Sequence, residues 1–183
     1  MNKVIFGGSR KLGKLSKAIK QHADNIISQM CLVLVGDANG ADRAMQEYLA
    51  EKKYPHVLVF CAGNTCRNNV GSWETRCVPT GRACKDFRHY AARDAEMIKE
   101  ADYGFMVWDG KSKGTVNNIV GLVEMDKPVL VYFSPRKTFL TLKSNRDIVG
   151  LLTLCDRRVV ELLDNSLGIS RRIHEEQLQF NFT

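Results

Sequence analysis

Short, continuously apolar runs alternate with segments of helical spacing over most of this chain, and each run ends in glycine or a polar turn. Strands without polar alternation are typical of a parallel sheet, which is covered on both faces. The expected strands are residues 3–6, 32–35, 57–60, 103–108 and 128–133, and the expected helices are 15–28, 43–52, 89–100 and 115–125. This pattern predicts an α/β fold: a doubly wound, Rossmann-like open parallel sheet of about five strands with helices on both faces.

The residues from 135 onward have mostly helical spacing, at 139–142, 147–154 and 159–163. Because no linker precedes them, we expect a single domain over 1–183, with a core at 3–133 and a helical C-terminal extension at 135–183. Residues 177–183 mix polar side chains with Phe180 and Phe182. They predict an edge strand or a tail docked on a partner, such as a second copy in a homo-oligomer.

The charge balance favours an anionic partner. Lys and Arg number 27 against 20 Asp and Glu, a surplus of 7, which suits a nucleotide or a nucleic acid. No apolar run approaches the roughly 20 residues of a membrane span. The strand-like VIFGG follows closely on Met1, without the apolar stretch and cleavage site of a signal peptide. We expect a cytoplasmic protein that does not contact a membrane.

The chain has six cysteines, and four of them lie between residues 61 and 84. Their spacings lack the close CxxC pairs that are typical of structural zinc, so we expect no metal site. The chain length and the missing export signal favour reduced thiols. The cysteines are Cys31, Cys61, Cys66, Cys77, Cys84 and Cys155.

The first strand ends in a turn suited to an anion. Gly7 and Gly8 permit a tight bend, and Ser9 can cap the next helix or contact a phosphate. Arg10 offers a planar fork for phosphate or carboxylate. We include all four residues in the candidate binding site.

The second strand ends in GDANGAD, and we place Gly36, Asp37 and Ala38 in the same candidate site. The carboxylate of Asp37 either accepts hydrogen bonds from a ribose hydroxyl or forms the corner of a turn, and the sequence favours neither. Asp42 is expected to cap the following helix and to interact with its positive end.

The third junction is the loop DGKSKGT between a strand and a helix. Helix N-termini present amide hydrogens that have no intrahelical partner, and they therefore bind anions. The loop is neither a Walker phosphate loop nor a GxGxxG fingerprint. Lys111 adds positive charge. The candidate ligand-binding residues here are Asp109, Gly110, Lys113, Gly114, Thr115 and Asn118, with Thr115 as the capping hydroxyl or a phosphate contact, Asp109 as an acceptor for sugar or base, and Asn117 beside Asn118 facing the crevice.

Taken together, GGSR, GDANGAD, CAGNTCRNNVGSWETR and ADYGFMVWDGKSKGTVNN resemble the SLOG superfamily of Rossmann-like proteins, and most closely its small bacterial YspA-like branch. The likeness covers roughly residues 3 to 133. It implies that a nucleotide or a nucleotide-derived ligand binds at the carboxyl edge of the sheet. Related groups are the Lonely Guy phosphoribohydrolases and the nucleoside 2-deoxyribosyltransferases, which work on N-glycosidic bonds, and DNA-processing protein A, which binds single-stranded DNA.

One departure separates this chain from the hydrolase relatives, which carry a glutamate in a GTxxE arrangement. Aligning Gly114 and Thr115 with that motif places Asn118 at the glutamate position. Because an amide is neither a base nor a nucleophile at neutral pH, the catalytic residues are unknown. The candidate acids are Asp94 and Asp109. For Asp94 together with Glu96, the favoured interpretation is a solvated helix face paired with Arg93 and Lys99.

Three functions compete. The first is a sensor or carrier that binds a nucleotide or sugar phosphate. The second is an enzyme that cleaves or transfers at an N-glycosidic bond, and the third is a binder of single-stranded nucleic acid. The sequence demands no cofactor, although Mg²⁺ can accompany a polyphosphate without leaving a motif. Trp73 is expected to cover a base or to anchor its long loop, and His89 is expected at the surface.

Overall fold

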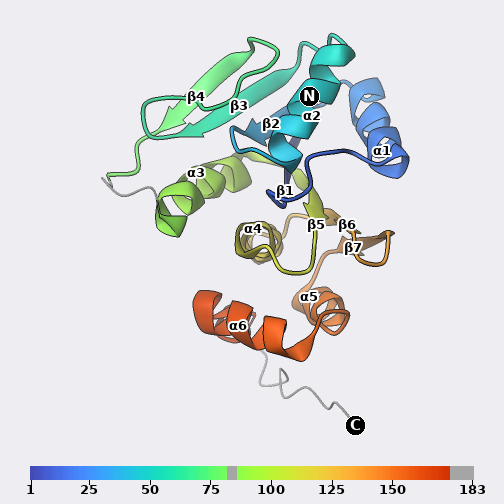
Figure 1. The fold of residues 1–183 in the computed structure, drawn as a ribbon, viewed down its shortest axis with the longest axis vertical. Helices are drawn as coiled ribbons and strands as arrows, with labels where there is room; N and C mark the ends of the chain where they lie inside the picture. Colours follow the sequence, from blue (N-terminus) through green and yellow to red (C-terminus); the bar gives the residue numbers. More distant parts are fainter. Residues whose placement is uncertain (82–85, 174–183) are drawn as a thin grey trace.

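The computed structural model of the chain describes residues 1–81 and 86–173. These residues form a seven-stranded sheet in the order β4-β3-β2-β1-β5-β6-β7 (Figure 1). All neighbouring strands pair in parallel except β6 and β7, which are antiparallel. The strands are β1 Lys3–Gly8, β2 Leu32–Gly36, β3 Val57–Ala62, β4 Glu74–Val78, β5 Tyr103–Trp108, β6 Val129–Phe133 and β7 Thr138–Leu142.

Helices cover both faces of this sheet (Figure 1). They are α1 Lys17–Ser28, α2 Ala41–Glu51, α3 Phe87–Glu100, α4 Lys113–Glu124, α5 Asn145–Leu152, α6 Arg157–Leu167 and α7 Ile169–Arg172. Polar side chains mark several helix starts: Ser16, Asp86, Ser144 and Asp156 each accept a backbone amide of the first turn. Among the described residues, no helix has the length and apolar character needed to cross a bilayer.

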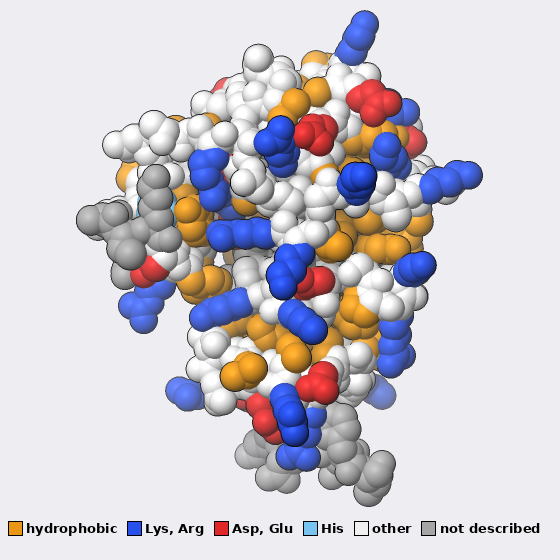
Figure 2. Space-filling model, in the orientation of Figure 1, with side chains coloured by type: hydrophobic (Ala, Val, Ile, Leu, Met, Phe, Trp, Pro, Cys, Tyr) orange, Lys and Arg blue, Asp and Glu red, His pale blue; other side chains and the backbone are white. Residues whose placement is uncertain are grey.

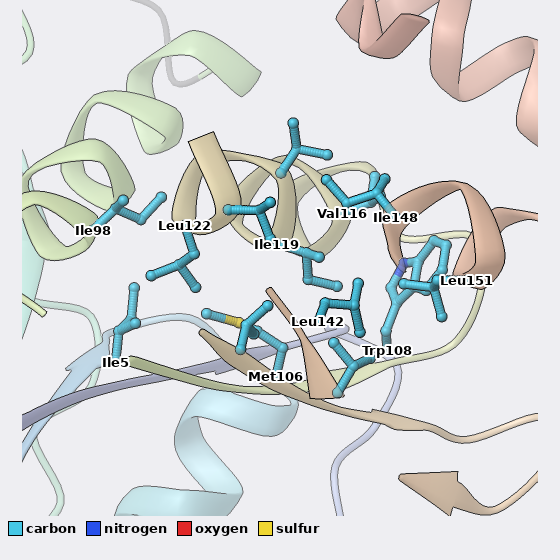
Figure 3. Close-up of a cluster of buried hydrophobic side chains, with 14 of the residues drawn as sticks. Ile5, Ile98, Met106, Trp108, Val116, Ile119, Leu122, Leu142, Ile148 and Leu151 are labelled. Carbon is cyan, nitrogen blue, oxygen red and sulfur yellow. The ribbon is translucent and has the colours of Figure 1, made fainter. Parts of the chain in front are cut away.

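The two faces of the sheet bury separate apolar clusters. Val4 and Phe6 of β1 pack against α1 and α2, whereas Ile5, which lies between them in the chain, faces the helices on the opposite side of the sheet. This alternation follows from the twofold period of a strand. In Figure 3, Ile119 and Leu122 of α4 lie over the sheet, with residues of α3 and α5 on either side. Both faces are therefore covered, as the apolar strands predict.

Two of the strands correct the sequence prediction. β4 lies inside 61–87, where no periodicity was expected: it is an edge strand, and four of its five residues are exposed, so it carries no apolar run. β7 replaces the helix expected at 139–142. Periodicity alone cannot separate a helix from a strand in so short an apolar run, and the turn after Phe133 returns the chain to pair with β6.

The direction of strand order changes between β1 and β5. From β1 the chain adds β2, β3 and β4 on one side, and then begins again with β5, β6 and β7 on the other. In open α/β sheets the crevice at the carboxyl ends of the two strands flanking this change is where ligands bind. The fold therefore positions a site at the ends of β1 and β5.

Candidate functional site

A crevice of about 470 Å³ opens at this edge of the sheet, within the range of small-molecule sites. Its walls come from the end of β1, the loop after β2, helix α3 and the loop that leads into α4. Of the residues predicted from sequence, it is lined by Gly7, Gly8, Arg10, Gly36, Ala38, Asp94, Asp109, Lys113, Gly114, Thr115 and Asn118. The three junctions thus meet in one site, whereas Ser9, Asp37 and Gly110 do not line it.

The loop before α4 is held in shape by its own side chains. Asp109 Oδ1 accepts the backbone amides of Lys111 at 3.0 Å and Ser112 at 2.7 Å, and Trp108 Nε1 donates to the Ser112 carbonyl at 3.0 Å. Asp109 therefore organises the loop, besides lining the crevice. Because the loop is ordered before a ligand arrives, it loses little entropy on binding.

Helix α4 begins two residues earlier than expected, with Ser112 rather than Thr115 at the N-cap. Within the described part of the chain, Ser112 makes no side-chain capping bond, so the first amides of α4 are not capped by it. Thr115 Oγ1 instead donates to Ser112 Oγ at 3.1 Å. The positive end of this helix therefore faces the crevice beside Lys111 and Lys113.

Ser9 joins the junctions instead of lining the crevice. It is 0% exposed; its Oγ accepts the Asp109 amide at 3.2 Å and its amide donates to the Val107 carbonyl at 3.0 Å. Its carbonyl accepts the Ala41 amide at 3.3 Å, at the start of α2. The predicted capping role is wrong, because Ser16 caps α1.

Gly8 and Gly36 leave room for neighbouring groups at the first two junctions. A Cβ on Gly8 would lie 2.6 Å from Ala41 Cβ and 2.7 Å from the Val107 carbonyl oxygen. A Cβ on Gly36 would lie 2.5 Å from Asp42 Oδ2 and 2.9 Å from Arg93 Cζ. A Cβ at Gly8 would therefore collide with the backbone of β5, and a Cβ at Gly36 would displace the side chains of Asp42 and Arg93. Gly110, in contrast, packs toward Phe133 behind the loop.

A buried ion cluster supports the floor of the crevice. Arg93 of α3 is 5% exposed, and its Nη1 donates to Asp37 Oδ1 at 2.6 Å. Its Nε and Nη2 donate to Asp94 Oδ1 at 2.8 Å and 2.5 Å. Burial by itself lowers the pKa of Arg93, but the carboxylates of Asp94, Asp42 and Asp37 outweigh it and raise the pKa above its usual value. The guanidinium therefore stays charged and links two elements of the site.

Asp37 is bound inside the protein rather than presented to a ligand. It is 1% exposed. Its Oδ2 accepts the Arg67 backbone amide at 3.0 Å and Nε at 3.2 Å, and its Oδ1 accepts Arg67 Nη2 at 2.6 Å, besides Arg93. Burial raises the pKa of this carboxyl, and the two arginines more than offset that effect, so the pKa lies below its usual value. Asp37 therefore has neither of the two roles expected from the sequence, the ribose contact or the corner of a turn: its oxygens bind Arg67 and Arg93.

Asp42 also differs from its expected role. Gly40 is the N-cap of α2, and Asp42 lies buried in the first turn. Burial raises the pKa of Asp42 to about 7; Arg93 opposes this rise, and the carboxylates of Asp94 and Asp37 add to it. Asp42 therefore titrates near neutral pH beside the crevice.

Asp94 and Asn118 form the polar floor. Asp94 is 8% exposed, so the solvated helix face expected for it is wrong, whereas Glu96 does lie outside and pairs with Lys99. Asn118 Nδ2 donates to Asp94 Oδ2 at 3.1 Å. Asn118 is 7% exposed, and among the described residues no donor reaches its Oδ1. An unpaired buried acceptor of this kind is costly unless something binds to it.

The rim of the crevice pairs cations with aromatic rings. The guanidinium carbons of Arg10 and Arg67 lie 5.0 Å and 4.5 Å from the centroid of the Tyr90 ring, and Lys113 Nζ lies 4.3 Å from that of Phe87. Figure 2 shows Lys and Arg side chains gathered in the middle of the visible face, where Figure 1 places α3, α4 and the end of β1. The rim is therefore positively charged.

Several other predicted residues lie elsewhere. Asn117 Oδ1 accepts Arg172 Nη1 at 2.9 Å, away from the crevice. Trp73 anchors its loop by donating from Nε1 to the Tyr54 carbonyl at 2.9 Å. His89 is buried, with Nδ1 2.8 Å from Thr80 Oγ1, and is not a surface residue. Phe180, Phe182 and Cys84 lie outside the described residues.

Sequence reasoning did not select Tyr90 or Arg67, and it assigned Arg93 to a solvated surface. The only available signal was the helical segment RHYAARDAEM, in which Tyr90, Arg93 and Asp94 fall on one helical face at spacings of three and four residues. Arg67 lies in an irregular loop, where no periodicity points to it.

Neither a protein-family model nor a curated protein matches this sequence. Two solved structures are similar. One is TM1055, a structural-genomics target, with 20% identity and a TM-score of 0.49, covering 70% of this chain and 72% of that one. The other is DNA processing protein A from Helicobacter pylori, described for its single-stranded DNA binding mode, with 16% identity and a TM-score of 0.51, covering 91% and 80%. The expected Rossmann-like α/β fold is confirmed.

Proposed function

We propose that this SLOG-type, Rossmann-like protein binds a nucleotide or another sugar phosphate in the crevice, as a sensor or carrier. The observation that carries the proposal is the convergence of the α4 N-terminus, Lys111, Lys113 and Arg10 on one cavity. Backbone amides at a helix N-terminus and basic side chains together favour a phosphate group.

The floor of the crevice suits a hydroxylated ligand. Asn118 Oδ1 is a buried acceptor without a donor among the described residues, and Asp94 beside it is a carboxylate held by Arg93. A sugar hydroxyl can donate to the Asp94 carboxylate, and it can donate to Asn118 Oδ1 after a small rotation of that side chain opens the oxygen to the crevice. Because position 118 carries an amide and not an acid, the floor holds the sugar without a general base at that position.

We expect a Lys113→Ala substitution to weaken binding of the best 5′-mononucleotide about tenfold, because one charge-assisted contact to phosphate is lost. Isothermal titration with AMP, GMP, CMP and UMP, with and without Mg²⁺, measures this effect. Lys99→Ala is the matched control, since Lys99 lies on the outer side of α3 and pairs with Glu96. If neither a mononucleotide nor ribose 5-phosphate binds the unaltered protein, the proposal is wrong.

We expect Asn118→Ala to weaken the same ligand about tenfold, because the acceptor for a sugar hydroxyl disappears. Asn117→Ala is the matched neighbour, and its side chain contacts Arg172 instead of the crevice. Equal affinities of the two variants would show that Oδ1 does not meet the ligand.

A second candidate function is cleavage at the N-glycosidic bond, which the position of Asp94 in the crevice favours. Chromatography of each mononucleotide after incubation with the protein separates the two candidates. Intact nucleotide is the result that we expect for a sensor or carrier. Base release that Asp94→Asn abolishes, while Glu96→Gln leaves it unchanged, would favour the enzyme.

A third candidate is binding of single-stranded nucleic acid, favoured by the net charge of +7. The similar DNA processing protein A is described for its single-stranded DNA binding. Such binding weakens steeply with salt, because phosphate contacts release counterions. Titration of a single-stranded oligonucleotide at rising salt concentrations tests this candidate, and absent or salt-insensitive binding would remove it.

A further inference from the structure

A cysteine pair lies beside Asp37, the carboxylate that pairs with Arg93 of the crevice. Cys61 is buried at the end of β3, and Cys66 is half-buried in the loop that follows. The two form a disulfide, in contrast to the reduced thiols expected from sequence. Their Cα atoms lie 5.0 Å apart, because the turn after β3 brings the chain back on itself. The sulfur atoms and a carboxylate oxygen of Asp37 all lie within 4.8 Å of one another.

This cluster is a poor cation site. Both oxygens of Asp37 already accept hydrogen bonds from Arg67 or Arg93. Two guanidinium groups therefore surround the carboxylate, and they repel a metal ion at the same place. The chemistry that remains for the pair is thiol–disulfide exchange.

The residues that follow Cys66 hold the second junction. Arg67 clamps the Asp37 side chain through three hydrogen bonds, and Asn68 Nδ2 donates to the Asp37 carbonyl at 2.7 Å. Gln46 of α2 fastens the same segment: its Nε2 donates to the Asn68 carbonyl at 3.3 Å, and its Oε1 accepts the Val70 amide at 3.0 Å. The disulfide thus fixes Cys66 to the end of β3, and the two residues after Cys66 are bound to Asp37.

Arg67 connects this loop to the wall of the crevice. Its guanidinium packs on Tyr90, which lines the cavity, 4.5 Å from the ring centroid. Through Asp37 it also meets Arg93, which holds Asp94 on the floor. Arg67, which follows Cys66 in the chain, is thus connected through Asp37 and Arg93 to Asp94. Asp94 is the group that would contact a ligand.

We propose that Cys61 and Cys66 form a thiol–disulfide switch that controls the ligand affinity of the crevice. The proposal rests on the function proposed above. In the disulfide form Arg67 is held against Asp37 and Tyr90, and the site has its full affinity. In the dithiol form the loop from 62 to 68 gains freedom, and the wall behind Tyr90 and Arg93 loosens.

The exchange needs an external thiol as the reductant. Its thiolate attacks Sγ of Cys66, which is half-buried and follows the exposed Asn64 and Thr65. The Cys61–Cys66 bond breaks, and Cys61 leaves as a thiolate that takes up a proton. A second external thiol then attacks the mixed disulfide and releases Cys66 as a thiol. Two external thiols are oxidised to one disulfide while the protein disulfide is reduced.

The test compares AMP affinity of the full chain, by isothermal titration, after oxidation with glutathione disulfide and after reduction with dithiothreitol. We expect affinity about tenfold lower in the reduced form, since a charged hydrogen-bond network at the site becomes mobile. Cys66→Ser should bind AMP with the affinity of the reduced form, and dithiothreitol should not change that affinity. Cys77→Ser is the control, because Cys77 is exposed and has a free thiol, and it should keep the response.

Hydrogen exchange of the Arg67 amide, which donates to Asp37 at 3.0 Å, supplies a readout without ligand. Reduction should accelerate this exchange about tenfold, because local opening becomes easier. Equal AMP affinity in the two redox forms overturns the switch, as does failure of glutathione disulfide to oxidise the pair. If none of AMP, GMP, CMP and UMP binds either form, the proposed function fails instead; unchanged Arg67 exchange then overturns the switch, and faster exchange supports it.

Discussion

Replacing Arg93 by methionine is expected to lower the free energy of unfolding by about 3–5 kcal/mol, because removing one partner leaves buried carboxylates without their counter-charge. Arg93 donates to Asp37 and Asp94, and both carboxylates are almost inaccessible to water. Methionine fills a similar volume but offers no proton. Urea denaturation followed by circular dichroism measures the loss.

Two further variants give this prediction its controls. Arg43→Met removes an exposed arginine that pairs with Glu47 one turn along α2, and it should change stability by less than about 0.5 kcal/mol. Arg93→Lys retains the charge but not the planar fork that spans two carboxylates, so it should fall between Arg93→Met and the unaltered protein. A loss below about 1 kcal/mol for Arg93→Met would contradict the assigned burial of the cluster.

The second large effect is a pH dependence of stability from Asp42. Burial raises its folded-state pKa to about 7, from 3.8 for a free carboxyl. Between these values the folded state holds a proton that the unfolded state has released, so stability falls as pH rises through this window. We expect Asp42 to contribute a loss of about 2–3 kcal/mol between about pH 5 and about pH 8.

Comparison with Asp42→Asn isolates this contribution, because the amide has nearly the same shape and does not titrate. The difference in unfolding free energy between the unaltered protein and this variant should shrink toward alkaline pH by the amount given above. Asp24→Asn is the control: Asp24 lies near the surface, and its hydrogen bond from Tyr48 lowers its pKa, so its contribution changes at acid pH. A constant difference between the protein and Asp42→Asn would contradict the assigned pKa.

The main elements of the fold could be read from the chain because burial on both faces leaves a clear pattern. Runs such as 32–35 and 103–108 are apolar throughout, and each appears as a strand in the sheet. β4 could not be found in this way, since it pairs only with β3 at the sheet edge and exposes residues such as Glu74 and Arg76. β7 was missed because its direction depends on pairing with β6, a contact that no local pattern encodes.

The location of the site could also be predicted from the order of strands and turns in the sequence, but the roles of several of its residues could not. Gly8, Gly36 and Lys113 line the crevice because parallel strands bring their carboxyl ends to one edge. Asp37 has the sequence position of a ligand contact, yet Arg67, thirty residues further along the chain, occupies both of its oxygens. A pairing partner at that distance cannot be read from neighbouring residues.

The layering of the sheet and the meeting of three glycine-bearing junctions could be predicted from the amino-acid sequence, because both depend on periodicity and on the short-range geometry of turns. Which charges are buried and which remain for a ligand became clear only from the packing of the folded chain. Arg93 and Asp94 were expected in water, and they lie instead under the crevice, with Asn118 Oδ1 left unpaired among the described residues. The physical reason is that burial and electrostatic pairing depend on how α3 and α4 pack against the sheet, a long-range arrangement that charge spacing along one helix does not encode.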